Sequence, residues 1–420
     1  MPRPARLLPL VVAVVAAISV LTAACGGDES SQSDNTTSAT TNPAFSEPAD
    51  PFYLPPDPLP EGRAGDVVRS EALPGAPAGS QAWRILYLSE GLTGERIAVS
   101  GMVVAPTAGA GTATTAPTAN RPVLSWAHPT TGVVDACAPS TMTTVFDLIP
   151  GLDAFLDAGY VVAATDYEGL GTPGVHPYLV GESEGRGVLD AARAARNLPG
   201  AMAGEQLLLW GHSQGGQGSL FAAQLAPSYA PELDLVATAA AAPAGELAKL
   251  LNLDADTAEG IVLGAYAVNS YAEVYADTTP PPMEDQVITA TGLPAIAPLV
   301  ELCNLTQSDQ MAPIAVPLTG NFFVGDPGSV EPWATLLSIN SAGGQRIESP
   351  VLVTQGDADT IVDPPTTTEL VAAYCAKGTA ITERTYPGVT HDEIGYSSAA
   401  DVAEWFASAL DGRTPTSGCN

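Results

Sequence analysis

The chain has 420 residues, of which 45% are hydrophobic, and a formal net charge of −31. This length is ample for a large apolar core. The negative charge would repel phosphates, which argues against a nucleic-acid partner. The acidic residues are too dispersed along the chain to mark a cation site.

The N-terminus has the pattern of a secretory signal. Arg3 and Arg6 precede an apolar stretch, residues 7–21, that is too short and wrongly flanked for a stable transmembrane helix. We therefore predict a signal peptide over residues 1–24 and an extracytoplasmic protein.

The small residues directly before Cys25 are typical of a bacterial lipobox, although Thr22 stands where an aliphatic residue is usual. A lipidated Cys25 would anchor the protein to the cell membrane, and simple secretion is the alternative. Residues 25–50 are rich in Ser, Thr, Asn and Gln and have few large apolar residues. Such a segment cannot bury enough surface to fold, so we predict a tether.

From about Pro51 onward, strand and helix patterns alternate. Apolar runs predict eight strands: Ala82–Leu88, Arg96–Val104, Pro122–Ala127, Tyr160–Thr165, Gln206–Trp210, Leu233–Ala239, Pro350–Thr354 and Ala380–Tyr386. Helical patterns lie between several of them: Leu152–Ala158, Gly185–Asn197, Gln214–Leu225, Thr366–Ala376 and Ala399–Leu410. This alternation predicts an α/β fold, with a mostly parallel eight-stranded sheet covered by helices on both faces.

The alternation stops between residues 243 and 344. This stretch has helical patterns at Glu246–Leu253 and Thr257–Ala272, several prolines and aromatic clusters, but no strand signals. We predict a cap or lid inserted between two parts of the core, residues 51–242 and 345–420. The alternative is a long structural excursion with no role at an active site.

The segment Gly211–Gly215 is a G-x-S-x-G turn between an apolar run, Leu207–Trp210, and a helical pattern. In this context the turn predicts a nucleophile elbow, which exposes the hydroxyl of Ser213 at the top of the sheet. The alternative is a glycine-rich turn with a surface serine. A serine hydroxyl needs a base within hydrogen-bond reach, and the base needs a carboxylate.

Four histidines are available as the base. After a nucleophile elbow, the acid and then the histidine follow the serine in chain order. His128 and His176 lie upstream of Ser213, and His212 is adjacent to it and would have difficulty folding back. His391 remains, in a loop directly after the last predicted strand, and a surface-loop histidine is the alternative reading.

Three aspartates follow the strand before His391 and compete as the acid. Asp359 is favoured because G-x-x-D-x-x-V loops of such hydrolases place the acid there. Asp357 could instead hold the turn, and Asp363 could cap the helix that follows. Asp359 would accept the Nδ1–H of His391.

An oxyanion needs two donors. The backbone N–H of Gln214, at the start of its helix, is the first candidate. The second should come from the loop after the third predicted strand, where Thr130 is favoured and Thr131 is the next choice. This chemistry requires no cofactor.

Four cysteines remain downstream of Cys25: Cys137, Cys303, Cys375 and Cys419. In an exported chain they predict two disulfides, for which three pairings are possible. Their spacing supports no zinc site, and no metal is expected.

Several stretches together resemble the secretory lipase family of α/β-hydrolases, which includes the fungal A-type lipase and exported actinobacterial members. They are WAHPTTGVVDACAPS, DYEGLGTPGVHPYLVGESEGRGVLDAARAAR, LLLWGHSQGGQGSLFAAQLAP, GDADTIVDPPTT and the loop before His391. The resemblance implies a helical cap and ester hydrolysis by Ser213, Asp359 and His391. It also favours the pairings Cys137–Cys303 and Cys375–Cys419.

One position departs from the family. Members commonly have His-Gly where this chain has His128-Pro129, and Pro129 lacks an N–H and restricts φ. That departure puts the geometry of the second oxyanion donor in doubt.

The sequence therefore predicts an exported serine esterase or lipase acting on small-molecule or lipid esters. Tyr167 and Glu168 follow the fourth predicted strand at the rim of the elbow and could line the substrate site or form only a turn. The alternatives are a peptidase or amidase of the same fold and a non-catalytic surface binding lipoprotein.

Overall fold

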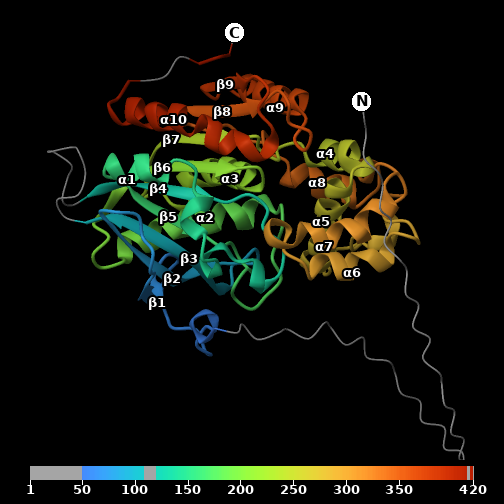
Figure 1. The fold of residues 1–420 in the computed structure, drawn as a ribbon, viewed down its shortest axis with the longest axis horizontal. Coiled ribbons are helices and arrows are strands. Elements are labelled where there is room, and N and C mark those ends of the chain that lie inside the picture. The colour runs from blue at the N-terminus through green and yellow to red at the C-terminus, as the bar shows by residue number, and fades with distance from the viewer. Residues whose placement is uncertain (1–49, 108–119, 414–416, 420) are drawn as a thin grey trace, which may run out of the picture. The chain divides into compact units, whose positions relative to one another are not determined.

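The computed structural model describes residues 50–107, 120–413 and 417–419. These residues contain a nine-stranded sheet (Figure 1). In chain order its strands are β1 (Val67–Ala72), β2 (Ser80–Glu90), β3 (Arg96–Pro106), β4 (Arg121–Ala127), β5 (Val161–Thr165), β6 (Ala203–His212), β7 (Asp234–Ala241), β8 (Val351–Gly356) and β9 (Ile381–Tyr386). The predicted signal peptide and the lipidation site at Cys25 lie outside the described residues.

The sheet order is β1-β2-β3-β5-β4-β6-β7-β8-β9. The pairs β1–β2, β2–β3 and β3–β5 are antiparallel. The remaining pairs, from β5–β4 to β8–β9, are parallel. All eight predicted strands are present, and the predicted fold class is confirmed. The predicted number of strands was one too low, because β1 is an edge strand with exposed polar residues and a weak apolar pattern.

The larger helices of the core cover both faces of the sheet (Figure 1). They are α1 (Leu152–Asp157), α2 (Gly181–Asn197), α3 (Gln214–Tyr229), α9 (Pro364–Ala376) and α10 (His391–Leu410). Alternate residues of the central strands enter two separate apolar clusters. Leu208 and Trp210 pack with α1 and α10, and Leu207 and Leu209 pack with α2 and α3. Burial on both faces explains why the parallel strands are almost wholly apolar.

Residues between β7 and β8 form a group of helices beside the sheet (Figure 1). These are α4 (Leu247–Leu253), α5 (Ala258–Val274), α6 (Leu293–Val300), α7 (Asn304–Ala315) and α8 (Trp333–Asn340), with several 3-10 turns. We call this segment the helical insertion. Helix α5 packs against α6 and α7 in its interior. No helix among the described residues has the length and apolarity needed to cross a bilayer.

Two disulfides are present. Cys137, in the segment after β4, is bonded to Cys303 at the start of α7, and Cys375 in α9 is bonded to Cys419. The first joins the core to the helical insertion across 166 residues of sequence, and the second fastens the C-terminus. These are the pairings that the family resemblance favours.

Candidate active site

Strands β4 and β6 are neighbours in the sheet, although β5 lies between them in sequence. From β4 the chain continues toward one edge of the sheet, and from β6 it continues toward the other. At such a switch point the loops at the carboxyl ends of two adjacent strands diverge and leave a crevice, which is the usual ligand site of an open α/β sheet. Ser213 follows β6 directly at this point.

Ser213 has φ +57° and ψ −117°, a strained conformation for a residue with a side chain. The surrounding backbone holds it there. Ser213 N–H donates to the carbonyl of Ala241 at 2.9 Å, and its own carbonyl accepts from the N–H of Gln217 and of Ala244, each at 3.1 Å. Strain of this kind costs about 1–3 kcal/mol and persists where neighbouring contacts fix it.

The two glycines of the turn allow close approach of three backbone segments. A Cβ on Gly211 would lie 2.0 Å from the carbonyl oxygen of Gly215. A Cβ on Gly215 would lie 1.9 Å from the carbonyl oxygen of Ala127, at the end of β4. Both positions therefore require glycine for the strand and helix to cross this closely.

The structure brings Ser213, His391 and Asp359 together in a chain of hydrogen bonds. His391 Nε2 lies 2.9 Å from Ser213 Oγ, and His391 Nδ1 lies 2.8 Å from Asp359 Oδ2. All three residues are buried, with exposed fractions between 5% and 9%. The three come from the ends of β6, β8 and β9, although 178 residues separate the serine from the histidine.

Asp359 determines the tautomer of His391. Burial opposes ionisation of this carboxyl, but hydrogen bonds from His391 and from the N–H groups of Ile361 and Val362 outweigh burial and hold its pKa below the ordinary value. An ionised carboxylate can only accept, so Nδ1 of His391 carries the proton. Nε2 is then free to accept the proton of the Ser213 hydroxyl.

Neither of the two competing aspartates is hydrogen-bonded to His391. Asp357 Oδ1 accepts from the N–H of Gly388, which ties the acid loop to the loop after β9. Asp363 is the N-cap residue of α9, but its side chain makes no capping hydrogen bond.

His391 is the first residue of α10, so the expectation of a loop was wrong at this position. Thr390 and Glu393 form a capping box, in which Glu393 accepts from the N–H of Thr390 at 3.1 Å and from its hydroxyl at 2.8 Å. The sequence T-x-x-E carries this signal and could have placed the start of the helix. A histidine fixed in the first turn of a capped helix has less freedom than one in a loop.

His212 lies against His391. The two ring centroids are 4.8 Å apart, and Nε2 of His212 is buried with no hydrogen-bond partner among the described residues. Burial lowers the pKa of His212 to about 3, so its ring stays neutral. It covers one side of the His391 imidazole and accepts no proton from Ser213.

The two candidate oxyanion segments line two different cavities that both include Ser213. Thr130 and Thr131 line one, and Gln214 lines the other. Gln214 is also the first residue of α3, where a backbone N–H has no intrahelical partner. The Thr130 hydroxyl lies 2.8 Å from the hydroxyl of Tyr178. The backbone N–H groups of Thr130 and Gln214 therefore remain candidates for the two donors.

The side chain of Gln214 belongs to a buried network that sequence patterns did not indicate. Its Nε2 donates to Glu184 Oε1 at 2.9 Å and lies 3.1 Å from His176 Nε2. Burial raises the pKa of Glu184 to about 8 and lowers that of His176 to about 3, so both are uncharged at neutral pH. This network fixes the residue next to the nucleophile.

Ser213 lies at two cavities, which are described below, and neither Tyr167 nor Glu168 lines either of them. The Tyr167 hydroxyl donates to the carbonyl of His128 at 3.0 Å, and Glu168 accepts from the hydroxyl of Ser183 at 2.6 Å. Of the two readings left open by the sequence, these hydrogen bonds favour the one in which both residues support the turn after β5.

Two cavities meet at Ser213. The larger, of about 320 Å³, has core residues such as Trp126 and His391 on one side and Glu259 and Leu263 of α5 on the other. The smaller, of about 40 Å³, is mainly apolar and extends under α4. Its lining residues are Tyr178, Leu179, Ser213, Gln214, Ala244, Leu247, Leu250, Leu251, Asp254, Gly260, Leu263, Ile361 and Val362. The described residues that line these two cavities include no lysine or arginine.

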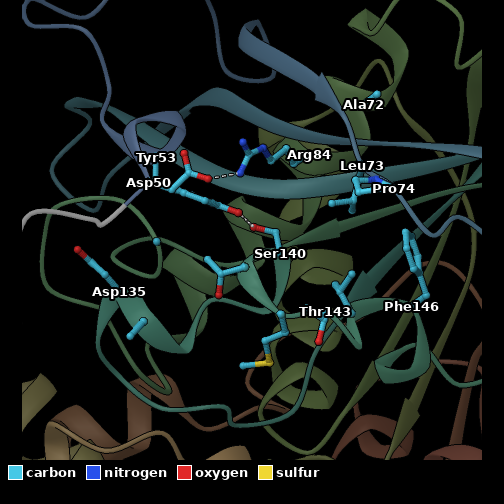
Figure 2. A pocket seen from close by; sticks show the side chains of 15 residues that line it. Asp50, Tyr53, Ala72, Leu73, Pro74, Arg84, Asp135, Ser140, Thr143 and Phe146 are labelled. Atoms are coloured by element: carbon cyan, nitrogen blue, oxygen red, sulfur yellow. Dashed lines mark hydrogen bonds and ion pairs between the residues drawn. The ribbon is translucent and has the colours of Figure 1, made fainter.

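A further cavity, of about 860 Å³, lies between the N-terminal strands and residues 135–146, which follow the loop after β4 (Figure 2). A hydrogen bond between Tyr53 and Ser140 and an ion pair between Asp50 and Arg84 cross it. It contains none of the three residues joined at Ser213. Its larger volume therefore does not make it the reaction site.

A family model for secretory lipases matches residues 136–418, about two thirds of the chain. The chain belongs to the secretory lipase family. The matched region includes the elbow, the acid loop and His391. Membership of this family, together with the two disulfides, favours an extracellular location.

Relatives of this chain include Lipase A of Arthroderma benhamiae, 26% identical over 88% of this chain and 81% of that protein. A Mycobacterium tuberculosis protein named as an inactive lipase is 31% identical, but the match covers 47% of this chain and less than half, 46%, of the relative. Among solved structures, Candida antarctica lipase A in its closed state has a TM-score of 0.71 at 22% identity, covering 90% of this chain and 89% of that one. This likeness shows a common α/β-hydrolase fold.

Proposed function

We propose that this secretory lipase is an exported serine esterase that hydrolyses carboxylic esters of acyl lipids through an acyl-enzyme on Ser213. The observation that carries the proposal is the hydrogen-bond chain from Ser213 through His391 to Asp359, at 2.9 and 2.8 Å. It supports nucleophilic catalysis because it links a hydroxyl, a base and an ionised acid in the order that the chemistry needs.

The reaction has two balanced halves. Ser213 Oγ forms a bond to the ester carbonyl carbon, the carbonyl electron pair moves to its oxygen, and the serine proton passes to His391 Nε2. The oxyanion collapses, the bond to the alcohol oxygen breaks, and Nε2 returns the proton to that oxygen. Water then attacks the acyl-enzyme by the same steps and releases the acid.

The two cavities favour a division of the substrate. The small cavity under α4 would take the acyl chain, since its lining is mainly leucine, isoleucine and valine. The cavity of about 320 Å³ would take the alcohol part. With about 40 Å³ of space beside Ser213, we expect short acyl chains to react faster than long ones.

The test combines labelling with hydrolysis. A fluorophosphonate probe should label the wild type and not Ser213→Ala, and Ser213→Ala should lose ester hydrolysis by at least about 10³-fold. Ser228→Ala, near the exposed end of α3, is the matched control and should behave as wild type. The substrates are p-nitrophenyl esters of increasing acyl length.

A folded wild type that neither takes up the probe nor hydrolyses any ester would overturn the proposal. That outcome would favour the non-catalytic interpretation, which the name of the Mycobacterium tuberculosis relative makes worth testing. Hydrolysis of aminopeptidase amides faster than of esters would favour a peptidase instead. Export through a lipidated Cys25 stays a separate prediction, to be checked by metabolic labelling with a fatty acid.

A further inference from the structure

The loop after β4 contains a buried hydroxyl without a partner. Thr131 is 2% exposed, and its Oγ1 has no hydrogen-bond partner among the described residues. Thr131 lines the same cavity as Ser213. An unpaired buried hydroxyl costs about 1–3 kcal/mol, so its presence beside a reaction site calls for a functional reason.

Several polar groups next to Thr131 have hydrogen-bond partners. The Thr130 hydroxyl bonds to Tyr178, and the carbonyl of His128 accepts from the Tyr167 hydroxyl. His128 Nδ1 lies 2.7 Å from the carbonyl of Pro129. Three polar groups that precede the Thr131 hydroxyl in the loop therefore have partners, and the unpaired hydroxyl does not reflect a generally loose segment.

The backbone beyond Thr131 is also fixed. Gly132 has φ +142°, and a Cβ there would lie 2.4 Å from Cys137 Sγ, which is bonded to Cys303. Eight residues after Gly132, the N–H of Ser140 donates to Asp166 at 2.9 Å, and its hydroxyl lies 2.9 Å from that of Tyr53 (Figure 2). Thr131 is thus held in place before any substrate arrives, as electrostatic stabilisation of a transition state requires.

The loop that carries Thr131 starts next to the nucleophile elbow. Ala127 at the end of β4 pairs with Gly211 at the start of the elbow, and the backbone of Gly215 packs against the carbonyls of Ala127 and His128. Three residues further along the loop from His128, Thr131 lines the cavity that also contains Ser213. The loop has one backbone donor fewer than a loop without proline, because Pro129 has no N–H.

We infer that the Thr131 hydroxyl donates a hydrogen bond to the oxyanion, beside the backbone N–H of Gln214. This inference rests on the proposed function, since an oxyanion forms only if Ser213 attacks a carbonyl. Thr131 is then a catalytic residue whose hydroxyl pairs with the substrate oxygen as negative charge develops there.

The test uses the isosteric variant Thr131→Val in the full-length protein. Loss of one oxyanion donor lowers kcat by about 10²-fold or more, and KM should change little because the donor acts in the transition state. Inhibition by a trifluoromethyl ketone, whose adduct carries the oxyanion, should weaken by the same factor as kcat/KM. Thr131→Ser keeps the hydroxyl and should retain kcat within a few-fold.

Thr172→Val is the matched control. Thr172 is also a buried threonine whose hydroxyl has no partner among the described residues, but it does not line the cavities at Ser213. Its kcat should equal that of the wild type, and both valine variants should melt at or above the wild-type temperature.

Two results overturn the inference in distinguishable ways. If the wild type hydrolyses esters and folded Thr131→Val keeps its kcat and its affinity for the ketone, the oxyanion role is wrong and the proposed function stands. If the wild type neither labels with fluorophosphonate nor hydrolyses esters, both fail. A loss of kcat in Thr131→Val that Thr131→Ser does not restore also contradicts a hydroxyl donor.

Discussion

The core and the helical insertion meet at Ser213 and contribute different kinds of residue. The core supplies Ser213, Asp359 and His391, each held by hydrogen bonds from two or more directions. The insertion supplies mainly apolar side chains, such as Leu250 and Leu263, that bound the cavities. Under the proposed function, the core would break the ester bond and the insertion would select the ester.

Helix α5 shows the same division along its own length. Near its C-terminal end, the Ser270 hydroxyl donates to the carbonyl of His176, and the Tyr271 hydroxyl donates to that of Leu179. Near its N-terminal end, Glu259 and Leu263 line the cavity over Ser213. One part of the helix is therefore anchored to the core by hydrogen bonds, and the other lines the cavity at Ser213.

The largest effect should come from the core. Asp359→Asn keeps the size of the side chain but removes the carboxylate that holds His391 Nδ1–H. With the tautomer of His391 no longer fixed, kcat should fall by about 10⁴-fold. The measurement is the steady-state rate on a short-chain p-nitrophenyl ester, with a melting curve to show that the variant folds.

Asp363→Asn is the control for that change, because Asp363 caps α9 without a side-chain hydrogen bond. Its kcat should stay within a few-fold of wild type. If Asp359→Asn kept most of its activity, the hydrogen-bond chain would not be the catalytic apparatus, and the contrast between core and insertion would fail.

The sequence predicted the three residues joined at Ser213, but it did not predict the buried network beside them. The elbow, Asp359 and His391 follow from the order of strands and from local motifs, which a sequence carries directly. The partners of Gln214, namely Glu184 and His176, are joined to it by long-range contacts within the fold. No local pattern marks such contacts, since they depend on how separate elements pack.

Three other features of the site also depend on where individual side chains lie in the folded protein. The sequence left open whether Tyr167 lines the substrate site or supports a turn, and its hydroxyl, which donates to the loop after β4, favours the turn. The sequence also could not show that the Thr130 hydroxyl bonds to Tyr178 whereas the Thr131 hydroxyl has no partner among the described residues, because both facts depend on the fold. The shape of the cavity under α4 arises from residues of the insertion and could not be read from their order.

A smaller effect should come from the insertion. Leu250 is 7% exposed and lines the small cavity, so Leu250→Ala enlarges the space for an acyl chain. The ratio of kcat/KM for a long over a short acyl ester should rise by about 10-fold, a typical size for a change of this kind in an apolar pocket. The ester series reports this ratio, which is independent of enzyme concentration.

Leu253→Ala on the same helix is the matched control, because Leu253 is 51% exposed and does not line the cavity. Its chain-length profile should match the wild type. Leu250→Ala should also lose stability, about 2–5 kcal/mol for a buried leucine, so the assay is run well below its melting temperature. An unchanged profile in Leu250→Ala would show that the acyl chain lies elsewhere.

The smallest effect concerns the pH dependence of stability in the core. Burial raises the pKa of Glu184 to about 8, whereas in the unfolded chain it has an ordinary value near 4.5. Between these values the folded protein binds more protons than the unfolded one, so the free energy of unfolding falls as pH rises from about 4.5 to 8. Below about pH 4.5 the contribution of Glu184 to the free energy of unfolding is fully present, and above about pH 8 this contribution is lost.

Glu184→Gln mimics the protonated acid and can still accept from the Gln214 side chain and from the N–H of Leu179. The variant should have a flatter dependence of melting temperature on pH across this window and should be more stable than wild type near pH 8. Thermal melts between pH 4.5 and 8.5 measure both. Equal slopes for the two proteins would mean that Glu184 ionises normally, and the uncharged network behind the elbow would then need a different account.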